Sequence, residues 1–330
     1  MKIAVIGGGS WGSTLANVLS DNGHETLIYD INEMAVNDIN FTHKHPFFDT
    51  YLNDDIKATT NIKEALDFAD NLLISVPTKV MRNVLVQINQ LINTPKTFIN
   101  VSKGIEPETL LTVSQIAYEV IDNNLIAGFV TLSGPSHAEE VILRKLTTLV
   151  AASKNEERAK FVQNLFSNRE YMRVYTSNDI LGVEVGGSVK NAIALISGIS
   201  AGLGMGENAR AALISRGAIE IAKITEVMGG SKDTVFGLAG IGDLIVTASS
   251  LNSRNFQAGL KIGKGENIDD VVKNSRMVVE GARVIISAKE IAEKYNLELP
   301  IIQTAYNVLY ENKPVKEMLA YLLQRDLKAE

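Results

Sequence analysis

The sequence predicts an α/β domain with a parallel sheet over residues 1–178, followed by an all-α domain over residues 179–330. The length of 330 residues exceeds the size at which one hydrophobic core usually stops growing. Up to about Tyr175, short β-rich runs alternate with helical segments, as in a sheet covered by helices. Beyond about Asn178, long helical patterns replace the β-rich runs, and this change alone indicates the domain boundary.

The elements of the first half can be followed in order. Short segments rich in β-branched residues predict strands at Ile3–Ile6, Thr26–Tyr29, Asn71–Val76, Thr97–Val101, Phe129–Leu132, Thr148–Ala151 and Met172–Tyr175. Helical patterns lie between most of them, which favours parallel pairing. The polar segment Phe41–Asp55 predicts a loop in which His43, His45 and Asp49 face solvent and bind no metal.

In the second half, Ala209–Val227 and Ala282–Tyr295 have long helical patterns. The uncharged stretch Asn191–Gly206 carries repeated glycines and is shorter than the roughly 20 apolar residues of a membrane span. The apolar run that begins at Ile3 breaks at Gly7, too early for a signal-peptide core. We therefore expect a soluble chain with no membrane insertion.

The composition excludes several classes of function. A net charge of -6 and an isoelectric point near 5.4 argue against a nucleic-acid surface, which needs an excess of lysine and arginine. The chain has no cysteine, which excludes disulfides, thiol nucleophiles and thiolate metal sites. The lack of cysteine also fits the reducing cytoplasm, where we expect the protein to act.

A glycine-rich loop follows the first predicted strand. Its sequence, Gly7-Gly8-Gly9-Ser10-Trp11-Gly12, has glycines at Gly7, Gly9 and Gly12 in the GxGxxG pattern and precedes the helical run Ser13–Leu19. Such a loop lets backbone amides approach a pyrophosphate at a helix N-terminus. The strand, loop and helix context therefore predicts a dinucleotide site.

Asp30 ends the second predicted strand, where a carboxylate can accept a hydrogen bond from a ribose 2'-hydroxyl and repel a 2'-phosphate. This position favours NAD over NADP. The alternatives that Asp30 faces solvent or caps a helix remain open at this point.

Polar tips follow three other predicted strands. They are Ser75-Val76-Pro77, Ser102-Lys103-Gly104 and Ser133-Gly134-Pro135-Ser136. In open α/β sheets, ligands bind outside the carboxyl ends of the strands, so these tips predict a cleft with Lys103 on its rim. Ser136 has the position of a helix N-cap, a role that is compatible with anion binding.

Lys190 stands in Gly186-Gly187-Ser188-Val189-Lys190-Asn191, where it is the only charged residue between Glu184 and Glu207. Glycines inside a helix cost roughly 1 kcal/mol each, so their number indicates the close approach of a backbone or a ligand. Burial disfavours the charged amine, which suits proton transfer near neutral pH. A lysine whose head reaches solvent is the alternative.

Two further segments carry polar side chains that suit the same candidate site as Lys190. Gly240-Ile241-Gly242-Asp243-Leu244 offers Asp243, which could orient Lys190 or accept a hydroxyl proton. Ser253-Arg254-Asn255 combines a guanidinium, which binds phosphate in a bidentate manner, with neutral donors on both sides. This tripeptide predicts a phosphate clamp.

Taken together, the motifs resemble those of the bacterial-type NAD(P)-dependent glycerol-3-phosphate dehydrogenase family. The resemblance runs from residue 2 to about residue 310 and rests on Gly7–Gly12, Ser102–Glu106, Leu132–Ala138, Gly186–Asn191, Gly240–Leu244 and Ser253–Asn255. It implies a Rossmann-type domain followed by a helical domain like the C-terminal domain of 6-phosphogluconate dehydrogenase. It also implies a homodimer that supplies glycerol 3-phosphate for phospholipid synthesis.

The resemblance also implies a role for each site residue. Lys190 matches the proton-transferring lysine, assisted by Lys103. Substrate-lining positions fall on Lys103, Gly134, Ser136, Lys190, Asp243, Ser253, Arg254 and Asn255. Cofactor-contacting positions fall on Ser10, Trp11, Lys103, Ala138, Arg254, Val278 and Glu280. The family often has a basic residue after the second strand, whereas this chain has Asp30-Ile31-Asn32, so either NAD or NADP is possible and Asp30 favours NAD.

The implied reaction interconverts dihydroxyacetone phosphate and sn-glycerol 3-phosphate by hydride transfer. Two alternatives remain open on the sequence alone. A ketopantoate or β-hydroxyacid reductase would share the cofactor loop and the lysine but would not require Ser253-Arg254-Asn255. A non-catalytic nucleotide-sensing module would need no Lys190.

Overall fold

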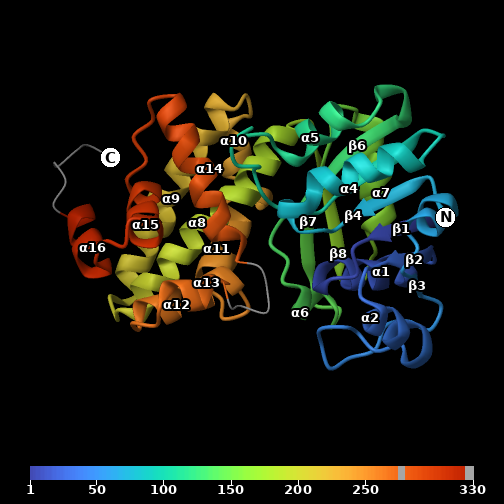
Figure 1. Ribbon diagram of the computed structural model, residues 1–330, viewed down its shortest axis with the longest axis horizontal. Coiled ribbons are helices and arrows are strands. Elements are labelled where there is room, and N and C mark those ends of the chain that lie inside the picture. The colour runs from blue at the N-terminus through green and yellow to red at the C-terminus, as the bar shows by residue number, and fades with distance from the viewer. Residues whose placement is uncertain (274–278, 324–330) are drawn as a thin grey trace. The chain divides into compact units, whose positions relative to one another are not determined.

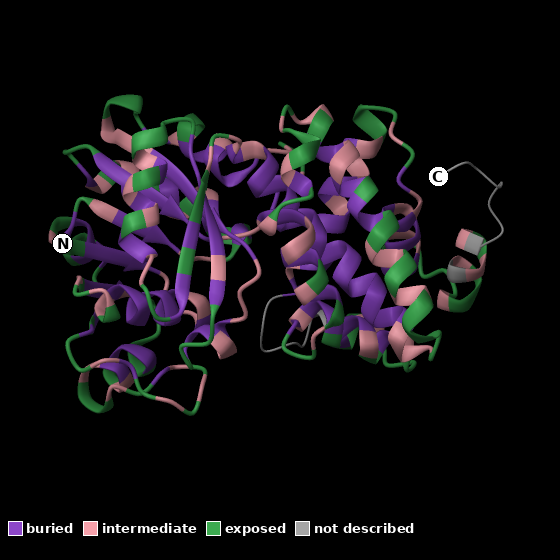
Figure 2. Ribbon diagram, turned by 180° about the vertical axis from the view of Figure 1, so that it is seen from behind, coloured by how far each residue is buried: buried purple, intermediate pink, exposed green. Residues whose placement is uncertain are grey.

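The computed structural model describes residues 1–273 and 279–323. The chain divides into two compact units (Figure 1). The first unit consists of Met1–Lys103 and Leu111–Ile180. The second unit takes Gly104–Leu110 together with the chain from Leu181 onward. In each unit the buried residues follow the strands or the inner helices (Figure 2).

The first unit is built on one eight-stranded sheet in the order β3-β2-β1-β4-β5-β6-β7-β8. The strands are β1 (Lys2–Ile6), β2 (Glu25–Tyr29), β3 (Lys57–Thr59), β4 (Asn71–Ile74), β5 (Lys96–Asn100), β6 (Ile126–Ser133), β7 (Thr147–Ala152) and β8 (Met172–Ser177). The first strand, β1, pairs with β2 on one side and with β4 on the other. The chain therefore builds the sheet outward from β1 in one direction and then changes direction at β4. Such a change of direction opens a crevice at the carboxyl ends of the strands, where open α/β sheets bind ligands.

The predicted fold class is confirmed, and two details of the sheet differ from the prediction. The sequence pattern missed β3, which is only three residues long and begins with a lysine. β7 pairs antiparallel with β6, so β7 and β8 run opposite to the other strands. A parallel return needs a long crossover, usually a full helix, whereas the connection between β6 and β7 contains only the four-residue helix α6 (Ala138–Val141).

Helices cover the sheet, and capping side chains fix the start of some of them. Besides α6, they are α1 (Ser10–Asp21), α2 (Glu33–Asn37), α3 (Ile62–Phe68), α4 (Thr78–Leu91), α5 (Val113–Val120) and α7 (Glu156–Phe166). Asn61 caps α3 and Asn155 caps α7 by accepting hydrogen bonds from backbone amides of the first turn. A π-helical turn, Asp38–Thr42, follows α2.

The second unit is helical. Its helices are α8 (Ile180–Gly202), α9 (Gly206–Val227), α10 (Lys232–Val235), α11 (Asp243–Ser249), α12 (Arg254–Gly263), α13 (Ile268–Lys273), α14 (Glu280–Lys294), α15 (Pro300–Tyr310) and α16 (Val315–Leu323). The segment Gly104–Leu110 belongs here because Ile105 lies in its core and the Ile105 carbonyl accepts a hydrogen bond from Ser287.

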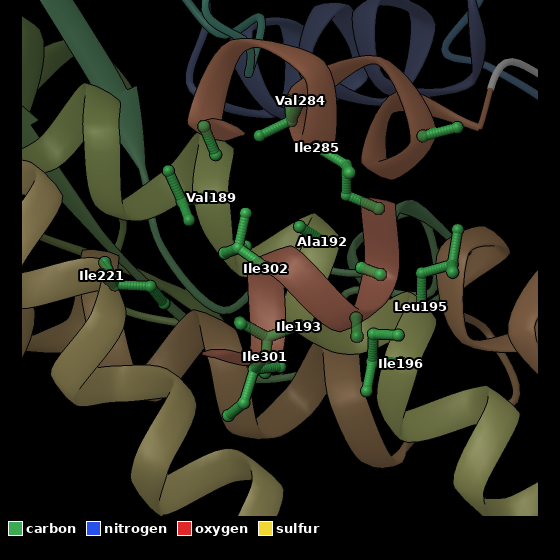
Figure 3. Packing of buried hydrophobic residues seen from close by; sticks show 14 of the residues in the cluster. Val189, Ala192, Ile193, Leu195, Ile196, Ile221, Val284, Ile285, Ile301 and Ile302 are labelled. Carbon is green, nitrogen blue, oxygen red and sulfur yellow. The ribbon is translucent and has the colours of Figure 1, made fainter. Parts of the chain in front are cut away.

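Helix α8 forms the centre of the second unit. Its apolar side chains pack against those of α9, α14 and α15 (Figure 3). Among the described residues α8 is the one helix long and apolar enough to cross a membrane, yet 94% of its apolar window is buried in the protein. It is therefore a core helix.

Glycines let α8 and α12 meet at the level of their backbones. A Cβ atom on Gly198 would lie 2.1 Å from the Phe256 carbonyl oxygen, and one on Gly259 would lie 2.0 Å from the Leu195 carbonyl oxygen. Because this contact leaves no room for side chains, it fixes the position of α12 along α8. The start of α12, at Arg254, is thereby placed relative to the middle of α8.

Candidate active site

The loop between β1 and α1 is shaped by glycines that tolerate no side chain. Gly7 has a φ of +108°, and a Cβ atom on Gly12 would lie 2.0 Å from the Gly7 carbonyl oxygen. Helix α1 begins after Gly9, which offers no capping side chain, and no acidic residue lies in its first turn. Amides at such a terminus bind phosphate. The residues present therefore fit the pyrophosphate of a dinucleotide.

Asp30 supports this loop from the end of β2. Its Oδ2 accepts a 2.7 Å hydrogen bond from the Gly8 amide, and its Oδ1 accepts a 2.9 Å bond from the Asn32 amide. Asn32, and not Asp30, caps α2. Since each carboxylate oxygen can accept more than one hydrogen bond, Asp30 retains capacity for a ribose hydroxyl.

Trp11 lies in the first turn of α1 and is partly buried against the core of the first unit. Its ring therefore contributes to packing whether or not a cofactor is bound.

The segment 41–55 corrects one sequence prediction. His45 does not face solvent: it is 1% exposed and its ring stacks on Phe48 with centroids 4.5 Å apart. Both ring nitrogens have partners, which is why a histidine can be buried here without a metal. Asp49 is exposed, as predicted.

The carboxyl ends of β5 and β6 bring Lys103 and Ser136 to the same carbonyl. Lys103 Nζ donates to the Gly134 oxygen at 3.4 Å, and Ser136 Oγ donates to it at 3.0 Å. Ser102 Oγ donates to the Val76 oxygen at 2.7 Å, which ties the ends of β4 and β5 together. This rim of the first unit therefore offers an amine and a hydroxyl side by side.

The prediction that Ser136 is a helix N-cap is wrong. The N-cap of α6 is His137, which makes no side-chain capping bond, and Ala138 is the first helical residue. The hydroxyl of Ser136 instead turns back to Gly134, whose φ of +147° directs the chain away from the strand.

In the second unit, Lys190 meets Asp243 and Thr247 inside the protein. Lys190 Nζ donates to Asp243 Oδ1 and to Thr247 Oγ1, both at 2.5 Å. Lys190 is 5% exposed and Asp243 is 1% exposed. The carboxylate opposes the effect of burial, so it favours an ammonium group that has a proton to give. The alternative of a lysine head in solvent is excluded.

Glycine contacts explain why these side chains meet. A Cβ atom on Gly186 would lie 3.3 Å from the Ala239 oxygen and 3.4 Å from the Gly240 Cα atom. The π-helical turn Leu238–Gly242 can therefore approach α8 one turn before Lys190. Asp243 follows this turn at the start of α11, which directs its carboxylate to the lysine.

The tripeptide at the start of α12 has structural partners. Ser253 caps α12, with its Oγ accepting from the Phe256 amide at 3.2 Å. Asn255 Nδ2 donates to Asn191 Oδ1 at 3.0 Å, and Asn255 Oδ1 accepts from the Gly281 amide at 2.8 Å. The Ser253 hydroxyl and the second Asn255 amide hydrogen remain able to donate to a ligand. Arg254 is half-buried beside them.

Sequence reasoning missed two side chains of this cluster. Thr247 follows Asp243 by four residues on α11, a spacing that places both on one helix face. Asn191 was part of a motif but had no assigned partner. Glu280 begins α14 beside Gly281, whereas Val278 lies outside the described residues.

Comparison with known proteins identifies relatives over the whole chain. Residues 2–159 match the description "NAD-dependent glycerol-3-phosphate dehydrogenase N-terminus", and residues 179–320 match the corresponding C-terminus. The chain is 58% identical over 330 residues to the glycerol-3-phosphate dehydrogenase [NAD(P)+] of Acholeplasma laidlawii, covering 100% of this chain and 99% of the relative. The protein of that name from Staphylococcus haemolyticus is 46% identical over 331 residues, with the same coverage.

Solved structures agree with the sequence relatives. A crystal structure of glycerol-3-phosphate dehydrogenase from Coxiella burnetii has a TM-score of 0.92 and 30% identity, covering 98% of this chain and 99% of that one. A ketopantoate reductase from Ralstonia eutropha has a TM-score of 0.61 and 14% identity, covering 97% of this chain and 100% of that one. The second likeness extends to the fold alone.

Proposed function

The chain belongs to the NAD-dependent glycerol-3-phosphate dehydrogenase family, and we propose that it interconverts dihydroxyacetone phosphate and sn-glycerol 3-phosphate with Lys190 as the proton donor. The observation that carries this assignment is the buried contact of Lys190 Nζ with Asp243 and Thr247. The same residues would act in reverse when glycerol 3-phosphate is oxidised.

Lys190 acts on the substrate oxygen. A reduced nicotinamide cofactor, when bound, supplies the hydride for the ketone carbon. As the carbonyl oxygen gains negative charge, the Lys190 ammonium stabilises it and transfers a proton to it, which leaves a hydroxyl and a neutral amine. The Asp243 carboxylate orients the amine and favours its reprotonation from solvent. Lys103, on the rim of the first unit, is assigned the assisting role that the family resemblance implies.

The phosphate end of the substrate is assigned to Arg254. Its guanidinium can pair with two phosphate oxygens, and the Ser253 hydroxyl and Asn255 amide can donate to the others. Because α12 is fixed on α8 through glycine contacts, a phosphate held there also fixes the distance of the ketone from Lys190. The binding energy gained at the phosphate end is thus used to align the ketone carbon for the reaction.

The first unit is assigned to the cofactor. The uncapped start of α1 suits the pyrophosphate, and Asp30 suits the ribose hydroxyls of NAD. We expect NADH to be used more efficiently than NADPH, because a 2'-phosphate would approach the Asp30 carboxylate.

The proposed assay follows NADH and NADPH oxidation at 340 nm with dihydroxyacetone phosphate, and separately with ketopantoate. We expect oxidation with dihydroxyacetone phosphate only, faster with NADH. Turnover of ketopantoate but not of the triose phosphate would overturn the proposal. If neither cofactor is oxidised with either substrate while NADH still binds, the proposal is overturned and the alternative of a nucleotide-sensing module is favoured.

The setting of the reaction is proposed as well. We assign the protein to the cytoplasm as a homodimer that makes glycerol 3-phosphate available for phospholipid synthesis. Light scattering of the purified protein tests the assembly: a mass of about twice 35.9 kDa is expected, and a mass near 35.9 kDa would contradict it.

A further inference from the structure

We propose that His45 is a positioning residue for the cofactor site, and that its ring holds the first turn of α1 in the conformation that binds the dinucleotide phosphates. The inference rests on the proposed function only in identifying the ligand as a nicotinamide dinucleotide. His45 lies in the segment between β2 and β3, far in sequence from the glycine-rich loop that it supports.

One side of the His45 ring organises its own segment. Nδ1 accepts hydrogen bonds from the backbone amides of Phe47 at 3.1 Å and Phe48 at 3.3 Å. A nitrogen that accepts twice carries no proton, so the proton of the neutral ring sits on Nε2. The Phe48 ring stacks on the imidazole, and the His45 amide donates to the Thr50 oxygen at 2.9 Å. The tautomer of His45 is thereby fixed by the backbone.

The other side of the ring reaches α1. Nε2 lies 3.3 Å from Thr14 Oγ1, and Thr14 Oγ1 donates to the Ser10 carbonyl oxygen at 2.7 Å. The hydroxyl of Thr14 uses its one proton on Ser10, so toward His45 it can only accept, and the Nε2 proton of His45 faces both Thr14 Oγ1 and the Ser10 carbonyl oxygen. A directed chain of hydrogen bonds therefore runs from His45 through Thr14 to Ser10, the first residue of α1.

The protonation state of His45 is compatible with this role. Burial lowers the pKa of His45 to about 4, although a hydrogen bond with the Ser10 backbone acts in the opposite direction. The ring is therefore neutral near pH 7 and keeps the tautomer that the chain of hydrogen bonds requires.

The chain of hydrogen bonds matters because the other contacts of the loop act on Gly7 and Gly8, where Gly7 donates to Tyr29, Gly8 donates to Asp30, and Ser13 donates to Gly8, whereas His45 acts on the first turn of α1. The glycines from Gly7 to Gly9 carry no side chains, and glycine gives a backbone more freedom than any other residue. If His45 did not hold the first turn of α1, the ligand would have to order it on binding. That ordering cost would weaken cofactor binding and leave the chemistry of bound substrate unchanged.

The test uses the full chain and NADH alone. Trp11 is the only tryptophan of the sequence and lies in the loop itself, so NADH binding can be followed by quenching of its emission. In His45→Asn, the amide oxygen can replace Nδ1 for the two backbone amides, but nothing reaches Thr14. Thr14→Val removes the route through the hydroxyl and leaves the contact of His45 with the Ser10 backbone. His43→Asn is the matched control, because asparagine tolerates the left-handed conformation of His43, with a φ of +53°.

We expect His45→Asn and Thr14→Val each to raise the Kd for NADH about tenfold, the loss of about one hydrogen bond. The double variant should be little weaker than either single variant, because both break one chain. The KM for the triose phosphate and kcat at saturating NADH should stay within about twofold of wild type. His43→Asn should bind as wild type does.

Wild-type NADH affinity in a folded His45→Asn or Thr14→Val protein would overturn the proposal, and so would a loss of kcat at unchanged Kd. If His45→Asn does not fold, Thr14→Val decides alone. The binding measurement needs no turnover. A wild-type protein that binds NADH but does not reduce the triose phosphate would therefore refute the proposed function and leave this test intact.

Discussion

The backbone contact between α8 and α12 makes Gly259→Ala the most informative single substitution. The added Cβ would lie 2.0 Å from the Leu195 carbonyl oxygen and 2.8 Å from the Ile199 nitrogen. Neither atom belongs to a flexible side chain, so the helices themselves must separate. A carbon and an oxygen in contact need more than about 3 Å, so the shift is on the order of 1 Å.

Two effects of this shift can be estimated. Overpacking of a core costs about 1–3 kcal/mol, and a clash with backbone at this distance belongs at the upper end. A loss of about 3 kcal/mol lowers the midpoint of thermal unfolding by roughly 6–12 °C in a unit of this size. A misplacement of about 1 Å between Arg254 and Lys190 should also lower kcat/KM for the triose phosphate by about 100-fold.

The assay combines calorimetry, steady-state kinetics and NADH titration. The Kd for NADH should change far less than kcat/KM, because α8 and α12 contribute no part of the glycine-rich loop and only Arg254 of α12 is assigned to the cofactor. Lys261→Ala, an exposed position on the same helix, serves as the control and should behave as wild type. A Gly259→Ala protein with wild-type melting temperature and wild-type kcat/KM would refute the reasoning that this contact sets the geometry of the site.

Three further predictions follow from the site. Asp30→Asn removes the charge that opposes a 2'-phosphate. In steady-state assays, the ratio of kcat/KM for NADPH to kcat/KM for NADH should therefore rise about tenfold. An unchanged ratio would contradict the role of Asp30. Arg254→Gln should raise the KM for the triose phosphate about 10- to 100-fold, which corresponds to the loss of a hydrogen bond to a charged group. In the control Lys261→Gln, this KM should stay at the wild-type value. The pKa of His45 is about 4 in the folded protein and near 6.5 in the unfolded chain, so between these values the unfolded chain binds a proton that the folded protein does not. The contribution of His45 to the free energy of unfolding is therefore fully present above pH 6.5 and is lost as the pH falls toward 4. Urea unfolding should show the wild type losing up to about 3 kcal/mol more than His45→Asn over that range, and parallel curves would contradict a buried neutral imidazole.

Local patterns were enough to predict most of the fold. The strands from β1 to β8 have clear β-rich runs, except for β3, whose three residues carry no pattern. The glycine-rich loop could be predicted because a tight turn requires residues without side chains at fixed positions. The reversal at β7 could not be predicted, because the length of α6 decides it and a four-residue helix leaves almost no periodic signal.

The partners of individual side chains were harder to predict than the elements. The glycines around Lys190 indicated close packing, yet only the structure identifies the turn Leu238–Gly242 as what approaches there. His45 lies in a polar stretch, and its burial depends on Thr14 and on two backbone amides that no local pattern connects to it. Such contacts depend on tertiary packing, which composition and periodicity do not encode.

The central claim is that Lys190 gives the substrate oxygen its proton. Single-turnover oxidation of bound NADH by saturating dihydroxyacetone phosphate tests it in Lys190→Ala, with the exposed Lys154→Ala as control. We expect Lys190→Ala to be slower by about 100-fold or more at unchanged NADH affinity, the usual worth of general acid catalysis, and Lys154→Ala to match wild type. A Lys190→Ala rate within about twofold of wild type would contradict the account.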